Sequence, residues 1–261
     1  FSVPCKATRA NGGRTRNLPH HDLDKWNLFV EYNRQDVVAE MAIMNKLKSV
    51  KVPEGEWEQW RMDIRMNERG IAIDTNLVNS SLWISEYWNE KLMDEARDIT
   101  GLDNPNSTSQ LLEWLKSQDV KVENLQKVTV EKVIKEVTGK VKRVLEIRKE
   151  LSKTSTKKYV AMKAALGEQN RVRGLLQFYG ANRTGRWAGR LVQVQNLPRN
   201  YIQDLSGTRE VVKRRDVATL EILYGNIPDT LSQLIRTAFV PEEGKKFVIA
   251  DFSAIEARVI A

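Results

Sequence analysis

The chain has 261 residues, of which 41% are hydrophobic and 29% charged, so it can bury a core and does not have the composition of a disordered or collagen-like protein. Its one cysteine, Cys5, excludes an intrachain disulfide and a cysteine-based zinc site. No apolar run approaches the roughly 18 residues of a membrane span, and 42 Lys and Arg against 34 Asp and Glu give a net charge of +8, which favours an anionic partner such as nucleic acid.

Helices dominate the expected structure, after a polar loop of about 20 residues. Apolar side chains from Trp26 to Met41 have the spacing of a helix with one buried face. Ser80 or Ser81 is expected to cap a later helix, and Ser107–Gln110 has the form of a capping box. The expected helices cover residues 24–51, 57–68, 81–100, 111–115, 129–137, 141–166, 204–224 and 230–238, and another begins at Ile255.

Extended segments are expected at three places, which makes the fold class mainly helical α+β. One covers residues 71–74, and others lie around Gly180 and Gly185. The last is the apolar run Phe247–Ala250, which ends in the carboxylate of Asp251. The pattern predicts a buried strand with an acidic group at its exposed end.

Basic residues are concentrated in two stretches. Residues 140–158 carry eight Lys and Arg and two Glu, which fits a solvated helix face as well as a phosphate-binding one. Residues 171–199 carry six arginines and no acid. In the second stretch Arg183, Arg186 and Arg190 alternate with small and polar residues, and arginine forks suit phosphate oxygens. This stretch predicts contact with a nucleic-acid backbone.

The sharpest local pattern is a pair of carboxylates, Asp251 and Glu256, at a predicted strand-to-helix junction. Hard cations such as Mg²⁺ take oxygen ligands from one or two carboxylates and substrate phosphates. Alternatively, Asp251 is a helix cap and Glu256 a surface charge. From spacing alone the second interpretation is favoured.

The residues around this pair resemble a known motif. Asp251–Arg258 is similar to the first palm motif of family A DNA polymerases, the bacterial polymerase I group, which usually reads Asp-Tyr-Ser-Gln-Ile-Glu-Leu-Arg. It departs from that motif at Phe252, Ala254 and Ala257. The preceding segment, residues 235–241, also resembles the family.

A second motif occurs in the family's order. Thr184–Pro198 keeps the spacing of the family's segment from Thr-Gly-Arg to Gln-Asn-Ile-Pro. Replacements at Trp187, Gly189 and Val192 are of a kind associated with phage-type members. Two long motifs in this order argue against a chance match.

Shorter similarities extend the resemblance toward the N-terminus. Residues 66–74 are similar to the entry to the family's thumb, and residues 107–111 and 148–153 resemble thumb helices. Tyr32 and Asp36, four apart on one helix face, resemble the last motif of the 3′–5′ exonuclease domain. In that domain the Asp binds metal and the Tyr orients the attacking water.

The resemblance implies a fold of thumb helices plus the first strands of a palm sheet. It divides the chain into an exonuclease-like end over 1–52, a thumb-like region over 53–170 and the N-terminal part of a palm over 171–261. It implies DNA-directed DNA polymerase activity of a phage replication type, with two Mg²⁺ ions and deoxynucleoside triphosphates. Asp251 and Glu256 would be the catalytic residues, with Glu256 under the sugar.

The resemblance also assigns the remaining site residues. Asp251, the Phe252 carbonyl and, in the exonuclease remnant, Asp36 would bind metal. The residues expected to contact primer–template DNA are Arg183, Thr184, Arg186, Gln195 and Asn196.

The fingers cations and the second palm carboxylate of the family are not found in the sequence. We therefore expect a truncated fragment that binds DNA and neither polymerises nor proofreads alone. The alternative is a non-catalytic basic helical protein that binds nucleic acid. We expect a monomer without membrane association, in the cytoplasm (that of the host cell if the gene belongs to a phage).

Overall fold

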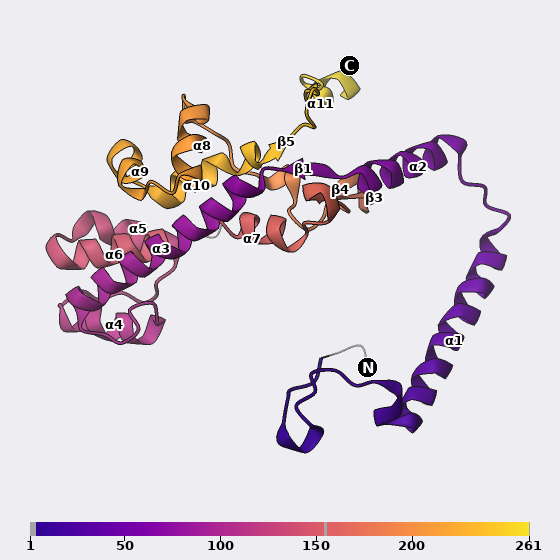
Figure 1. Cartoon of the computed structure of the whole chain (residues 1–261), viewed down its shortest axis with the longest axis horizontal. Coiled ribbons are helices and arrows are strands. Elements are labelled where there is room, and N and C mark those ends of the chain that lie inside the picture. The colour runs from indigo at the N-terminus through magenta and orange to yellow at the C-terminus, as the bar shows by residue number, and fades with distance from the viewer. Residues whose placement is uncertain (1–3, 154–155, 261) are drawn as a thin grey trace. The chain divides into compact units, whose positions relative to one another are not determined.

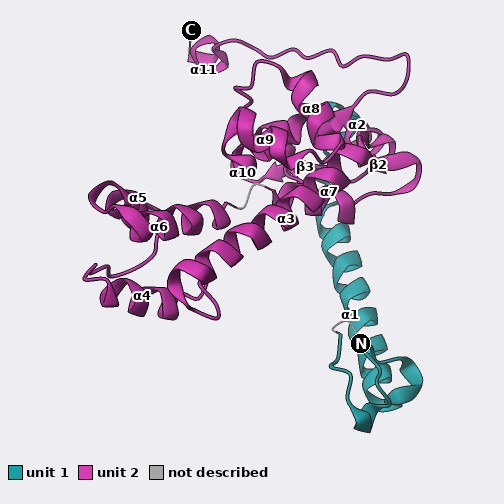
Figure 2. Cartoon of the chain, turned by 60° about the vertical axis from the view of Figure 1, so that its left-hand side comes forward, with its two compact units in different colours: residues 1–58 teal, residues 59–261 magenta. Residues whose placement is uncertain are grey.

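A computed structural model describes residues 4–153 and 156–260. The chain divides into two compact units, residues 1–58 and 59–261 (Figure 2). The expected mainly helical α+β class is confirmed (Figure 1). The helices are α1 (Leu23–Leu47), α2 (Glu54–Arg69), α3 (Thr75–Thr100), α4 (Thr108–Ser117), α5 (Lys127–Glu136), α6 (Gly139–Leu151), α7 (Lys157–Ala164), α8 (Leu205–Lys213), α9 (Val217–Tyr224), α10 (Ile227–Leu234) and α11 (Ile255–Ile260). The short 3₁₀ segments are η1 (Arg9–Asn11), η2 (Pro19–His21), η3 (Glu168–Asn170), η4 (Val194–Asn196) and η5 (Ile235–Ala238).

The first unit consists of a looped N-terminal segment and α1. Asp22 caps α1, since its carboxylate accepts a hydrogen bond from Lys25 N at 3.0 Å. The helix is confirmed, but the predicted burial of its apolar face is wrong. Val37 and Met41 are exposed. Among the described residues of this unit, only η2 and its loop lie against α1, near its beginning, so the rest of the apolar face is not covered.

In the second unit α3 begins five residues earlier than Ser80. Asp74 is its N-cap and accepts a hydrogen bond from Leu77 N at 3.0 Å, so the predicted Ser80 or Ser81 cap is wrong. Both serines are buried inside α3, where the Ser80 hydroxyl donates to Lys213 O at 3.2 Å. The end is as expected, at Gly101, whose φ of 68° is the left-handed conformation that favours glycine.

Two hydrophobic cores stabilise the second unit. The larger one gathers α3, α7, α8 and α10, with Leu77, Ile84 and Leu231 fully buried. The smaller one lies among α4, α5 and α6. The capping box expected at Ser107–Gln110 is not formed: α4 starts there, but the Gln110 side chain accepts from Asn104 N instead.

The predicted helix over 141–166 is wrong as a single element. Val144 and Leu145 of α6 are buried in the smaller core, whereas Tyr159 and Met162 of α7 are buried in the larger one. α6 ends at Leu151 and α7 begins at Lys157, and Ile147 of α6 is itself buried in the larger core; residues 154–155 of the prediction lie outside the described residues.

The predicted helix over 204–224 also divides in two. Arg215, with a φ of 58°, separates α8 from α9, and Asp216 caps α9. The polar Arg-Arg-Asp sequence at this break gives a turn and a new helix start, which the apolar periodicity alone did not indicate.

Two small antiparallel sheets complete the described fold. In the first, β1 (Ile71–Ile73) is the central strand between β2 (Arg171–Val172) and β5 (Phe239–Val240). The second is a hairpin of β3 (Leu176–Ala181) and β4 (Arg186–Gly189). The extended segments predicted over 71–74 and around Gly180 and Gly185 are thus confirmed, with Gly185 in the turn.

The buried strand predicted at Phe247–Ala250 is wrong. This segment is irregular, and Val248 and Ile249 are 85% and 90% exposed. A strand needs neighbouring strands to satisfy its backbone groups, and no other strand in the described residues pairs with this segment. The prediction of a helix beginning at Ile255 is confirmed by α11.

Candidate nucleic-acid interface

The β3–β4 hairpin is fastened to α2 by a polar network. Asn67 accepts a hydrogen bond from Leu176 N at 3.0 Å and donates to Leu176 O at 2.9 Å and to Asp63 at 3.1 Å. The buried Asp63 carboxylate also accepts from Trp187 Nε1 at 2.8 Å. One strand is therefore held through its backbone and the other through a side chain, and buried networks of this kind rigidify what they join.

The tip of this hairpin carries three of the predicted DNA-binding residues. Arg183 and Thr184 lie in the turn and Arg186 begins β4, and all three are exposed. Gly185 has a φ of 67° and makes the tight turn possible, with its N–H donating to Ala181 O at 2.9 Å. Within the described residues, the side chains of Arg183 and Arg186 form no hydrogen bond or ion pair, so they are available to an anion.

Two of the six arginines in this stretch have internal roles. Arg171 donates to the carbonyls of Arg69 and Gly70, at 2.6 and 2.8 Å, and pairs with Glu242 at 2.6 Å. Arg173 donates to Glu68 O at 2.8 Å. These two cations fix β2 and the chain after it to the end of α2, which leaves four arginines of the stretch for an external partner.

Gln195 and Asn196 lie together on η4 and are exposed. The Gln195 amide packs directly against Gly189, and a side chain at position 189 would displace it. Lys158 of α7 donates to Val192 O at 2.6 Å and so ties α7 to the chain just before η4.

A basic hollow of about 550 Å³ opens beside Asn196. Four lysines line it, and two acids, Glu131 and Asp229, balance part of their charge through pairs with Lys149 at 3.2 Å and Lys153 at 3.1 Å. The hydrogen bond from Lys149 is the main reason that the pKa of Glu131 lies below its usual value. The lining lysines are Lys127, Lys149, Lys153 and Lys158. Sequence reasoning missed Lys127, since only the packing of α5 on α6 brings it here.

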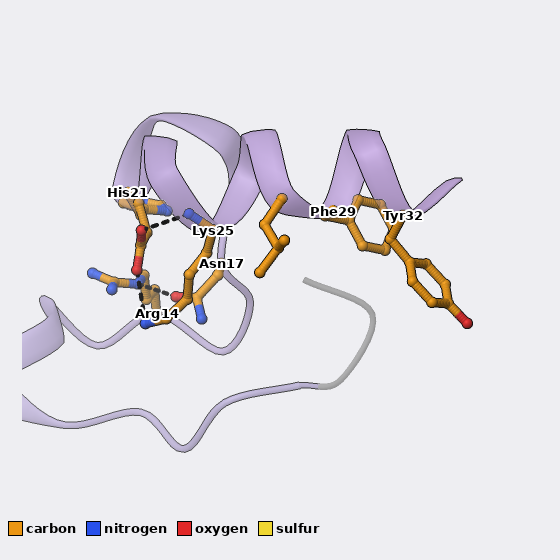
Figure 3. A pocket seen from close by; sticks show the side chains of 8 residues that line it. Arg14, Asn17, His21, Lys25, Phe29 and Tyr32 are labelled. Atoms are coloured by element: carbon orange, nitrogen blue, oxygen red, sulfur yellow. Dashed lines mark hydrogen bonds and ion pairs between the residues drawn. The ribbon is translucent and has the colours of Figure 1, made fainter. Parts of the chain in front are cut away.

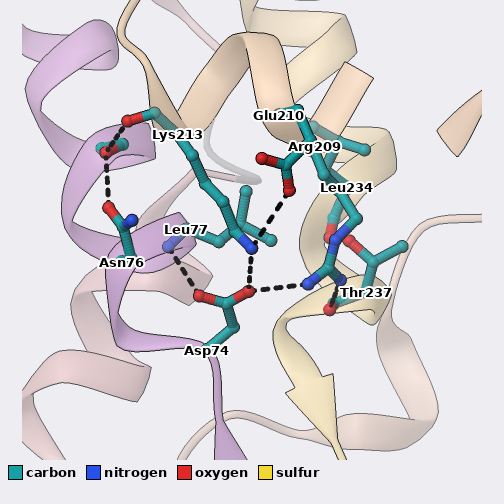
Figure 4. A network of polar contacts seen from close by, with 9 residues as sticks. Asp74, Asn76, Leu77, Arg209, Glu210, Lys213, Leu234 and Thr237 are labelled. Carbon is teal, nitrogen blue, oxygen red and sulfur yellow. Dashed lines mark hydrogen bonds and ion pairs between the residues drawn. The ribbon is translucent and has the colours of Figure 1, made fainter. Parts of the chain in front are cut away.

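An ionic network joins the N-terminal end of α3 to α8 (Figure 4). Asp74 pairs with Arg209 at 2.7 Å and with Lys213 at 2.9 Å, and Arg209 also donates to Thr237 O. Partial burial raises the pKa of Asp74, but the Leu77 N–H bond and the charges of Lys213 and Arg209 outweigh this and hold it below its usual value. The network joins segments that are 135 residues apart in sequence.

The predicted carboxylate pair lies on the exposed C-terminal segment. Asp251 and Phe252 precede α11, and Glu256 is in its first turn. Arg258 donates to Ser253 O at 2.9 Å, so this arginine supports the local turn. No group of three or more His, Cys, Asp or Glu side chains that could hold a metal occurs among the described residues.

The predicted exonuclease remnant lies in the first unit. Tyr32 and Asp36 are one turn apart on α1, and both are exposed. Tyr32 closes one end of a hollow of about 570 Å³ whose other end holds Arg14 and Lys25 (Figure 3). The structure places Asp36 outside the residues that line this hollow.

Neighbouring His20 and His21 belong to η2, and the His21 ring accepts a hydrogen bond from Leu18 N at 2.8 Å. Partial desolvation and the nearby charges of His20 and Arg14 lower the pKa of His21.

The part of the chain that the structure describes contains no helix long and apolar enough to cross a bilayer.

Comparison with known proteins agrees with the motifs on the hairpin and on the C-terminal segment. The sequence profile of DNA polymerase family A matches residues 85–261. The DNA polymerase of Bacillus phage SP02 is 52% identical over 262 aligned residues, which include all of this chain and 40% of the phage protein. No solved structure matches. The chain spans about 40% of the length of this curated relative, and it belongs to DNA polymerase family A.

Proposed function

We propose that this chain contributes the primer–template-binding surface of a DNA-directed DNA polymerase. The observation that carries the proposal is the hairpin tip, where Arg183 and Arg186 have no partner among the described residues and stand at a turn that α2 holds through Asn67 and Asp63. Arginine binds phosphate oxygens through a planar fork, and such contacts position a duplex without reading its sequence. In the predicted division, residues 53–170 are the thumb-like region, 171–261 begin the palm, and 1–52 end the exonuclease-like domain.

The basic hollow extends this surface. Lys127 and Lys158 bring positive charge beside Asn196, where a DNA backbone leaving the hairpin tip finds a second set of cations. Thr184 and Gln195 add neutral donors for phosphate or base-edge oxygens. The proposed partner of the surface is primer–template DNA.

Asp251 and Glu256 are proposed as the catalytic residues on the strength of the family motif. Metal ligation by Asp251, the Phe252 carbonyl and Asp36 stays a prediction, since no group of three or more His, Cys, Asp or Glu side chains stands together among the described residues. No reaction step is therefore derived through a metal. Glu256 is proposed to lie under the nucleotide sugar and to exclude a 2′-hydroxyl group.

A chimera tests the polymerase function. This chain replaces the matching 40% of the SP02 polymerase, and extension of a labelled primer is measured. The chimera is expected to extend the primer, and Asp251→Ala is expected to abolish extension. Glu243→Ala is the matched control, because this exposed carboxylate makes no hydrogen bond within the described residues. Equal activity of the Asp251→Ala and Glu243→Ala chimeras would contradict the catalytic assignment. An inactive chimera whose isolated chain still binds DNA would favour the non-catalytic alternative.

A further inference from the structure

Tyr179 occupies an unusual place in the hairpin. The residue is 52% exposed, and its backbone φ is 52°, a conformation that bulky side chains rarely adopt. The pairing register shows how this arises: Gln177 pairs with Ala188 and Ala181 with Arg186, so Phe178, Tyr179 and Gly180 all stand opposite Trp187. Bulges of this kind redirect a side chain, and they often occur beside functional sites.

A neighbouring aromatic side chain packs against the exposed ring of Tyr179. Tyr179 meets Phe178 edge to face at 5.9 Å, and Phe178 meets Trp187 in the same manner at 5.4 Å. Trp187 in turn donates to the buried Asp63. The aromatic series thus begins at a fixed, buried carboxylate and ends at a tyrosine in solvent, so little side-chain entropy remains to be lost when a ligand covers that tyrosine.

Two glycines allow this arrangement. A Cβ at Gly185 would lie 2.8 Å from Tyr179 Cε2, so the ring rests directly on the turn. A Cβ at Gly180 would lie 2.5 Å from Ala188 Cβ, so the bulge also needs a glycine. Arg183 and Arg186 stand on the same turn, and no acidic residue occurs from position 171 to 199.

We infer that Tyr179 is a stacking platform for an unpaired base of a single DNA strand, next to the arginines that hold its phosphates. The inference rests on the proposed function and adds a residue to its surface. A flat exposed ring pairs with the face of a base. Unpaired bases offer their faces, whereas bases inside a duplex are stacked on one another and offer only their edges in the grooves. Flanking arginines and the lack of acids match the charge of the strand.

The test measures the affinity of the isolated chain for a labelled single strand and for a blunt duplex of equal length, at one fixed salt concentration. Tyr179→Ala is expected to weaken single-strand binding by about 5- to 150-fold, the range for loss of one stacked base, and to change duplex binding by less than about twofold. Tyr179→Phe is expected to retain single-strand binding, because stacking does not need the hydroxyl.

Tyr87→Ala is the matched control, since Tyr87 is an exposed tyrosine on α3; it is expected to leave both affinities unchanged. Equal losses for the two DNA forms, or wild-type affinity of Tyr179→Ala for the single strand, would overturn the inference while leaving the arginine surface intact. A wild-type chain that binds neither form would overturn both the inference and the proposed function.

Discussion

Replacing Asn67 by alanine should loosen the β3–β4 hairpin. The side chain makes three hydrogen bonds, two to the backbone of Leu176 and one to Asp63. Each is worth about 0.5–1.5 kcal/mol net. Because Asn67 is only partly buried, water replaces some of them, and we expect a loss of about 2 kcal/mol in the free energy of unfolding.

For a unit of this size that loss corresponds to a fall of about 4–8 °C in Tm. Thermal unfolding followed by circular dichroism measures it, and single-strand and duplex DNA binding measured at low temperature should also weaken, because the arginines at the tip lose their fixed position. Asn89→Ala is the control, since Asn89 is exposed on α3 and makes no hydrogen bond in the described part of the chain. A Tm for Asn67→Ala equal to that of Asn89→Ala would refute the anchoring role.

Three further changes test the ion pairs of Asp74, the buried hydroxyl of Tyr159 and the proposed sugar contact of Glu256. Asp74 has a lowered pKa in the folded chain, so its ion pairs stabilise the fold fully above about pH 4, its unfolded pKa, and this stabilisation is lost as pH falls through the folded pKa. In Asp74→Asn, the free energy of unfolding by urea should therefore fall less steeply as the pH is lowered. A pH dependence equal to that of the wild-type chain would contradict this. Tyr159→Phe removes a buried hydroxyl that donates to Leu231 O at 2.7 Å and should cost about 1–2 kcal/mol by chemical denaturation; a stability equal to wild type would mean that the hydroxyl contributes nothing. In the SP02 chimera, Glu256→Ala should raise ribonucleotide relative to deoxyribonucleotide incorporation, and unchanged sugar discrimination would count against the sugar contact.

Local signals in the sequence were sufficient for many boundaries. Gly101 ends α3 and Gly185 makes the hairpin turn, because each needs a left-handed backbone that few other residues adopt. Long-range contacts account for the errors. Asp74 starts α3 in place of Ser80 because Arg209 and Lys213, far along the chain, also bind it.

The residues of the candidate site likewise include some that a local pattern indicates and some that depend on long-range contacts. Arg183, in the hairpin turn, and Arg186, at the start of β4, are both exposed, and both were assigned from a local motif. Arg171 has an internal role because its acceptors are backbone carbonyls about 100 residues away, which no local pattern indicates. Lys127 joins the basic hollow because α5 packs on α6. Phe247–Ala250 meets no pairing strand in the part of the chain that the structure describes.

If the hairpin tip binds DNA phosphates, Arg183 and Arg186 must contribute to the salt dependence of duplex binding. The logarithm of the binding constant is measured against the logarithm of salt concentration for the wild-type chain and for Arg183→Ala/Arg186→Ala. Each lost phosphate contact should reduce the slope by about 0.9, so the double variant should have a slope shallower by about 1.8. Lys46→Ala/Lys48→Ala removes the same charge from exposed positions around the end of α1 and should keep the wild-type slope. Equal slopes for the wild-type chain and the arginine variant would contradict the claim.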